Sequence, residues 1–192
     1  MDSLNWGKCV LAVLWAKAGE TTKTLHIFPV AAEDTTELST DEGDEVEATI
    51  EGGEVEAVRY TANKYNLTAQ IRTMNSRTKP LKDSDGRVDG QGSVVLIPEN
   101  MDTDYAIYIE NASARLVDSF TAADGGRFAY TFKALKASSG SQVKWGKLAL
   151  TGTGITDIDS LKTATIKTIK FTEIATDGET APTQTTIYTS GS

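Results

Sequence analysis

Side chains that could perform catalysis or hold a metal are few in this sequence of 192 residues, and they lie far apart. The single histidine, His26, falls within the apolar run 25–30, so neither a histidine-pair metal site nor a Ser-His-Asp triad is predicted. The single cysteine, Cys9, has no adjacent motif that would activate a thiolate. Phosphate-loop and G-x-S-x-G motifs are absent from the sequence. These residues indicate no nucleophilic or phosphate chemistry.

Acidic residues offer the remaining candidates for chemistry. Asp83-Ser84-Asp85-Gly86 with Asp89 has some character of a calcium loop, but the spacing differs from an EF-hand and no glutamate closes it. Carboxylates that could work as a general acid and base are abundant between 33 and 56, yet no spacing singles out one pair. We therefore expect no enzyme, no cofactor and no metal site, and we interpret 83–86 as an Asp- and Gly-rich turn.

The composition is that of an acidic globular domain, with a formal net charge of −8. No apolar run approaches the roughly 18 residues that a transmembrane helix needs. The apolar run 9–16 follows Asp2 and only one lysine, which favours a buried first strand over a signal peptide. One domain is the expectation for this length.

Short apolar or alternating segments recur along the chain, with no sustained helical period. This pattern predicts a mainly β protein: an antiparallel β-sandwich or barrel-like fold with at most one or two short helices. We expect a single domain over 1–192, with a long polar loop at 75–92 and a loosely held C-terminal tail from about 176. The segment 114–120 suits either a strand or a short helix, and the alternation slips at 167–169, where a bulge is predicted. The predicted core comprises Tyr65, Leu67, Ile71, Val95, Ile107, Ile109, Phe128, Tyr130 and Phe132.

The stretch 44–74 has the clearest strand pattern. Val46, Ala48 and Ile50 alternate with polar residues before Gly52-Gly53, and the alternation returns from Lys64 to 72. Because successive side chains of a strand point to opposite faces, we expect each run to have one buried and one solvated face.

Charge is divided along the chain. Eleven Asp or Glu residues fall between 33 and 56, whereas basic residues concentrate between 127 and 170. Opposite charges of this kind suit heterologous contacts between copies, in which one surface meets a different one. A solvated acidic face is the plainer interpretation. The residues predicted to act in assembly are Lys133, Lys136, Lys144, Lys147, Glu45, Glu47, Glu51 and Glu54.

A family resemblance rests on the order of these features. The features that carry the resemblance are the acidic segment leading to Glu51-Gly52-Gly53-Glu54, the alternating strand and polar loop after it, the run SVVLIPEN, and the turn Ala123-Asp124-Gly125-Gly126 before FAYTFKAL. Over about residues 25–150, the chain resembles phage tail tube (major tail) proteins. The resemblance implies a β-sandwich or barrel-like fold with a flanking helix, for which 112–119 is the best candidate. It also implies hexameric rings stacked into a tube.

In functional terms, the resemblance implies a structural subunit of the virion tail, assembled in the bacterial cytoplasm. Its partners would be copies of itself, other tail proteins, and DNA that passes through without specific binding, with no membrane involved. The alternative is a β-sandwich binding module for glycans or adhesion on a bacterial surface. Trp6, Trp15 and Trp145 could form its carbohydrate platform, although two of them adjoin apolar segments that favour packing.

Overall fold

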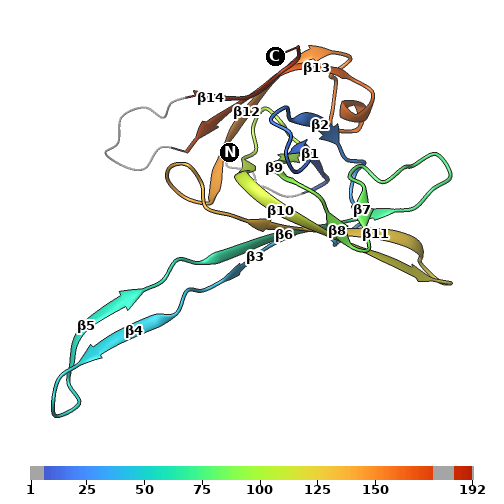
Figure 1. The fold of residues 1–192 in the computed structure, drawn as a ribbon. Helices are drawn as coiled ribbons and strands as arrows, with labels where there is room; N and C mark the ends of the chain where they lie inside the picture. The colour runs from blue at the N-terminus through green and yellow to red at the C-terminus, as the bar shows by residue number, and fades with distance from the viewer. Residues whose placement is uncertain (1–6, 175–183, 192) are drawn as a thin grey trace.

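The computed structural model describes residues 7–174 and 184–191, and it confirms a mainly β fold built from antiparallel sheets. Strands account for 57% of the described residues, which contain no α-helix and only a short 3-10 turn, η1 (Asp159–Lys162). One long strand, β10 (Ala106–Thr121), organises the arrangement because its two halves belong to different layers (Figure 1).

The first layer is built around the N-terminal half of β10, which lies between β9 and β12. On one side the order continues to β1 and β2, and on the other to β13 and β14. The bounds are β1 (Cys9–Ala16), β2 (Thr24–Ile27), β9 (Gln91–Pro98), β12 (Val143–Thr153), β13 (Thr165–Glu173) and β14 (Gln184–Thr189).

The second layer is built around the C-terminal half of β10, which pairs with β11, followed by β6 and the edge strand β3. Two short strands, β7 and β8, join at the other edge of β10. The bounds are β3 (Glu37–Asp41), β6 (Lys64–Arg72), β7 (Asp83–Ser84), β8 (Arg87–Val88) and β11 (Gly125–Ala134).

Two apolar clusters hold these layers together. The first cluster lies between the two layers. The second lies on the other face of the first layer and includes residues of β13 and η1. Strand β1 contributes to both: Leu11 and Val13 face the first cluster, whereas Val10 and Ala12 face the second. A strand that is covered on both faces needs apolar residues at every position, which explains the unbroken apolar run at 9–16.

The predicted core is confirmed with two refinements. Seven of the nine residues are buried, whereas Tyr65 and Phe128 are partly buried and pack against the first cluster. Phe28 joins them, with its ring centroid 5.0 Å from that of Tyr130.

The predicted polar loop at 75–92 is more structured than its sequence indicates. The Tyr130 hydroxyl donates a hydrogen bond of 2.8 Å to the carbonyl of Leu81, and Leu81 itself is buried. Asp85 and Gly86 both have positive φ, 52° and 80°, and they connect β7 to β8 as Asp-Gly does in a tight hairpin turn. The interpretation of 83–86 as an Asp- and Gly-rich turn is therefore confirmed.

The helix expected at 112–119 is wrong, because this segment lies within β10. Ala112, Ala114 and Leu116 are buried on one face at a spacing of two, and β11 pairs with them throughout. The predicted bulge is confirmed: Thr168 lies opposite Thr151 and Ile166 opposite Gly152, which leaves Lys167 without a partner in the ladder. In the predicted C-terminal tail, β14 pairs with β13, while 175–183 lie outside the described residues.

Candidate self-assembly surfaces

The residues first considered for chemistry have structural surroundings. His26 lies on β2, where burial lowers the pKa of its imidazole. Burial likewise raises the pKa of the Cys9 thiol, which opposes thiolate formation. The Asp83 carboxylate accepts hydrogen bonds from Lys79 Nζ (2.9 Å) and from the Gly86 amide (2.9 Å), so it stabilises its own turn. Across residues 7–174 and 184–191, no group of three or more His, Cys, Asp or Glu is placed to hold a metal ion.

The tryptophans give no common platform in the described part of the chain. Trp15 is buried, and its indole N–H donates to the carbonyl of Asp89 at 2.7 Å. Trp145, on β12, is 42% exposed. Trp6 lies outside the described residues. A sugar-stacking surface that includes Trp15 is therefore ruled out.

The most distinctive feature of the molecule is a two-stranded arm, residues 44–61, that projects from the body (Figure 1). It consists of β4 (Glu45–Thr49) and β5 (Val55–Tyr60), which pair with each other and with no other described strand. At its root, Thr61 donates its amide to the Asp44 carbonyl at 2.9 Å. At its tip, Gly52 and Gly53 have φ of 110° and 85°, a conformation that favours glycine.

The prediction of one buried face at 45–51 is wrong. Every residue of 44–64 is exposed, including Val46 at 55% and Tyr60 at 68%. The partner of β4 is β5, not the strand that starts at Lys64, which pairs with β3 and β11 instead. The alternation describes the pleat correctly, but no element among residues 7–174 and 184–191 covers the face that it makes apolar.

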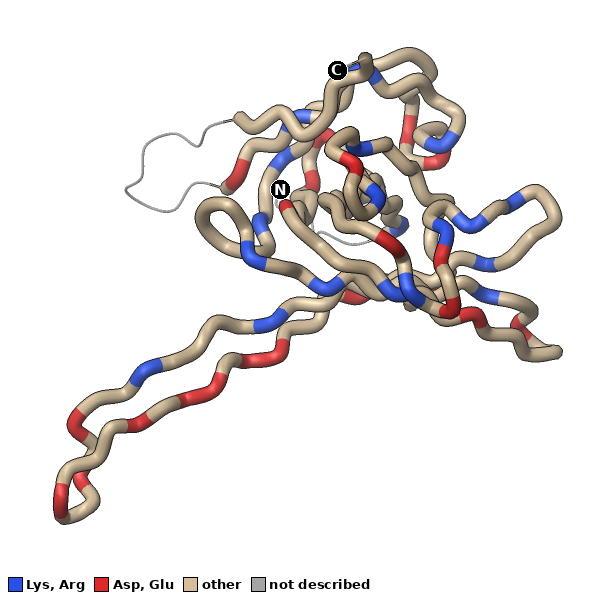
Figure 2. The backbone as a smooth tube through the Cα atoms, viewed as in Figure 1, with Lys and Arg blue, Asp and Glu red and all other residues tan. Residues whose placement is uncertain are grey.

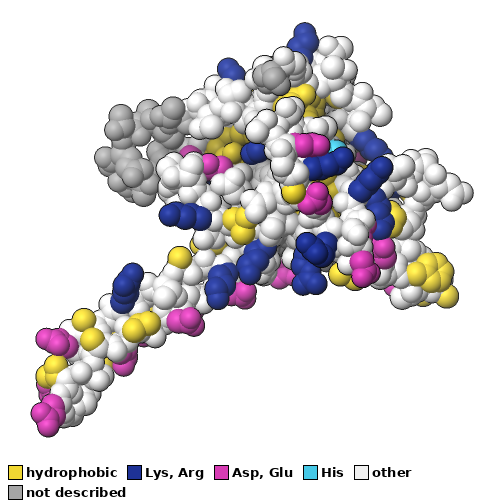
Figure 3. Space-filling model, viewed as in Figure 1, with side chains coloured by type: hydrophobic (Ala, Val, Ile, Leu, Met, Phe, Trp, Pro, Cys, Tyr) yellow, Lys and Arg dark blue, Asp and Glu magenta, His cyan; other side chains and the backbone are white. Residues whose placement is uncertain are grey.

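Residues opposite each other in a hairpin share a face, so the register defines two faces of the arm. On the first, which we name the acidic face, Glu45 lies opposite Tyr60 and Glu47 opposite Val58. On the other, the apolar face, Val46 lies opposite Arg59, and two alanines, 48 and 57, face each other. Figure 3 shows hydrophobic and acidic side chains interspersed along the arm.

The predicted assembly residues separate into two regions (Figure 2). All four glutamates lie on the arm: two on β4 and two at its tip, Glu51 and Glu54. The four lysines lie on the body. Lys133 is on β11 and Lys136 follows it, both exposed, whereas Lys144 and Lys147 are on β12. The structure thus brings the acids together but spreads the lysines over two strands and the segment between them.

Lys144 and Lys147 differ in their surroundings. Lys144 is largely buried, and its Nζ lies 3.8 Å from Glu110 Oε2, so it belongs to an internal ion pair. Lys147 is exposed. The sequence reasoning missed β5 (55–60), because charged and apolar residues occur on both of its faces and no clear alternation marks it.

No helix in residues 7–174 and 184–191 is long and apolar enough to cross a membrane. Comparison of the chain with models of known protein families finds no match, and a search of the curated proteins finds no relative.

Proposed function

We propose that this protein is a structural subunit that self-associates, and specifically a subunit of a phage-type tail tube that stacks in rings to form a conduit for DNA. The observation that carries the proposal is the arm: a hairpin with apolar side chains on both faces that no other element of the described residues covers. The resemblance of residues 25–150 to tail tube proteins supplies the tube as the form of assembly.

Contact with a partner would stabilise the arm. A two-stranded hairpin is marginally stable in water, and its stability usually comes from packing of one face. Val46, Val58 and Tyr60 are each at least 44% exposed, so the arm leaves apolar area in water that a second surface can bury. Burial contributes roughly 25 cal/mol per Å² of apolar area, which favours association.

A second copy is the partner that the charges favour. The arm carries six carboxylates and one guanidinium, whereas residues 127–170 carry eight basic side chains and only two acidic ones. An acidic projection on one region and a basic region elsewhere are suited to a heterologous contact, which repeats from copy to copy and generates rings or tubes.

Electron microscopy and sedimentation of the purified protein over a range of concentrations test the proposal. We expect rings or tubes at high concentration. Val58→Asp should reduce assembly, because it introduces a charge where the arm would bury apolar area. The matched control is Val117→Asp on β10, which adds the same charge at a position that is 62% exposed and outside the arm.

A protein that stays monomeric at every concentration would refute the proposal. If that monomer instead bound a glycan, the binding-module alternative would replace it. Equal effects of the two substitutions would also count against the arm as the contact element, since a general charge effect would then explain them.

A further inference from the structure

We infer that the arm of one copy docks on the solvent-exposed face of β12, β13 and β14 of a second copy, with the acidic face of the arm against it. This inference rests on the proposed self-association and names the surface that receives the arm. We call the receiving surface the lysine face. It comprises Trp145, Lys147, Ala149, Thr151, Thr168, Lys170, Thr172, Ile174, Gln184, Thr186 and Thr189.

The register shows why these residues form one surface. Lys147 lies opposite Thr172, and Lys170 lies opposite Ala149 on β12 and Thr186 on β14. The intervening residues, such as Leu148 and Phe171, face the second apolar cluster. One face of these three strands is therefore committed to the core, and the other is open to solvent.

The open face continues the inner surface of the first layer beyond the cover of the second layer. Ile107 and Val143, on the same face, are buried in the first apolar cluster. Trp145 lies opposite Ile107 but is 42% exposed, and Ile174, also 42% exposed, donates its amide to the Trp145 carbonyl at 2.9 Å. Two large apolar side chains therefore adjoin Lys147 at the point where the core ends.

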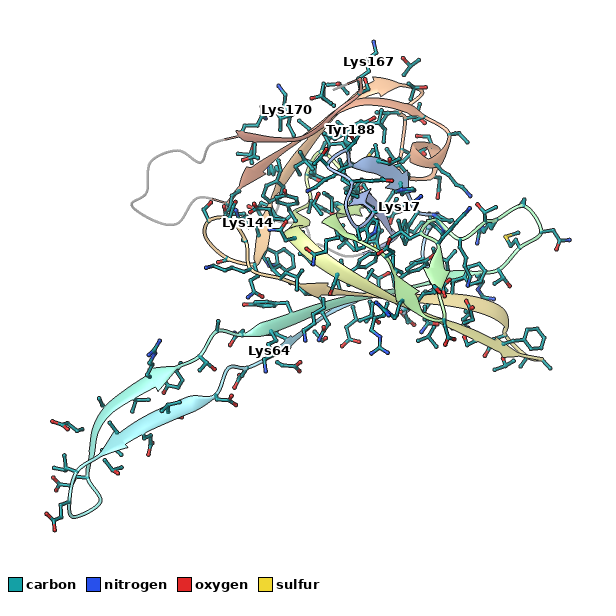
Figure 4. The ribbon with its side chains drawn as sticks, viewed as in Figure 1. Lys17, Lys64, Lys144, Lys167, Lys170 and Tyr188 are labelled. Atoms are coloured by element: carbon teal, nitrogen blue, oxygen red, sulfur yellow. The ribbon has the colours of Figure 1, made fainter. Side chains whose placement is uncertain are left out.

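The lysine face carries two positive charges and no carboxylate. Lys147 and Lys170 take part in none of the ion pairs within residues 7–174 and 184–191. Figure 4 shows Lys170 beside β13 with its side chain directed away from the body. The outward face of the second layer carries more cations, Lys64, Arg72, Arg115, Arg127 and Lys133, but it also includes Glu37 and Asp41. The lysine face differs in having no carboxylate and in having the exposed apolar side chains Trp145 and Ile174 beside its lysines.

The acidic face of the arm matches this surface in spacing as well as in sign. Glu45 and Glu47 are two residues apart on one strand, a separation of about 7 Å. Lys147 and Lys170 are diagonal neighbours on adjacent strands, which also places their Cβ atoms roughly 7–8 Å apart. Each pair of charges has apolar neighbours: Tyr60 and Val58 on the arm, and Trp145 and Ile174 on the lysine face.

Tyr60 and Val58 would meet Trp145 and Ile174 when the two pairs of charges face each other. Exposed ion pairs contribute little to affinity on their own, so the apolar contact supplies attraction while the charges fix the face and the register. Docking within one copy is excluded by geometry, because the arm extends away from the body that carries β12–β14 (Figure 1).

A charge-exchange experiment tests the pairing. The variants are Glu45→Lys with Glu47→Lys, Lys147→Glu with Lys170→Glu, and all four substitutions in one chain. Sedimentation gives the protein concentration at which each assembles. Each double variant should require a concentration about tenfold higher than the parent, since two pairs are replaced by repulsions. The fourfold variant should return to within roughly twofold of the parent, because attraction is restored with the signs exchanged.

The control is Lys17→Glu with Lys82→Glu, which changes the net charge as much as the lysine-face variant. These two lysines border the pocket between the β1–β2 turn and the 75–92 loop, away from β12–β14. We expect assembly close to that of the parent. Circular dichroism confirms that every variant, altered only at surface positions, keeps its fold.

The outcomes separate the two proposals. If the parent assembles but the fourfold variant is as weak as either double variant, the docking surface is wrong and self-association stands. A control variant that is impaired as much as the lysine-face variant also overturns the docking surface. If the parent never assembles, the proposed function itself fails.

Discussion

Removal of the arm should separate stability from assembly. Replacing residues 45–60 by Asn-Gly would join Asp44 to Thr61 through a two-residue turn, at the point where the Thr61 amide already donates to the Asp44 carbonyl. The residues removed are all exposed, and their strands pair only with each other. The body should therefore fold without them.

The size of the effect follows from chain entropy. Each doubling of loop length costs about 0.6 kcal/mol, and the replacement shortens the connection roughly eightfold, or three doublings. The shortened connection should thus stabilise the body by at most about 2 kcal/mol, because the ordered arm behaves less like a free loop than this relation assumes. At the same time the shortened protein should no longer form rings or tubes.

Urea unfolding of parent and shortened protein at a concentration below assembly gives the free energy of unfolding. Sedimentation of both at high concentration gives the assembly state. A loss of more than about 2 kcal/mol on shortening would refute the reasoning, since it would mean that the arm packs on its own body in solution. Assembly of the shortened protein at the parent's concentration would refute the role of the arm.

Three further predictions concern the core, acid stability and salt. Leu67→Asp should lower the free energy of unfolding by several kcal/mol in urea, because it loses apolar burial and buries a charge, whereas Thr68→Asp on the outward face should change it far less. Hydrogen bonds from Lys79, and to a lesser extent from the Gly86 amide, hold the pKa of the Asp83 carboxyl below its usual value. The contribution of Asp83 to stability is therefore present above about pH 4 and is lost as pH falls through the lowered pKa. The difference in unfolding free energy between the parent and Asp83→Asn should shrink over that pH range, and a constant difference would contradict this prediction. Assembly measured by sedimentation should weaken as salt rises towards about 1 M, where charges are screened over roughly 3 Å, and assembly that is insensitive to salt would argue against an electrostatic contribution.

Much of the fold could be predicted from local patterns. The alternation in 64–72 and 127–136 predicted β6 and β11 with the correct buried faces, because the pleat fixes which side chains share a face. The unbroken apolar run at 9–16 predicted a buried strand, and Asp85-Gly86 lies where a turn was expected. Each of these properties depends on residues that are close in sequence.

The candidate site required contacts between distant residues. Alternation at 45–51 predicted an apolar face but not what covers it, and only the tertiary structure places β4 on an arm beyond the reach of the body. The segment 112–119 suited a strand or a short helix until pairing with β11 decided for the strand.

The sequence also predicted an acidic and a basic group of residues, but not where each side chain lies on the molecule. It singled out Lys144 and Lys147 together, yet Lys144 pairs with Glu110 while Lys147 lies on an open sheet face beside Trp145. Sequence by itself therefore determined which side chains alternate and where the chain turns, since backbone geometry imposes both locally. The tertiary structure decided which faces are covered and which charges remain in solvent, because coverage depends on strands that are far apart in the chain.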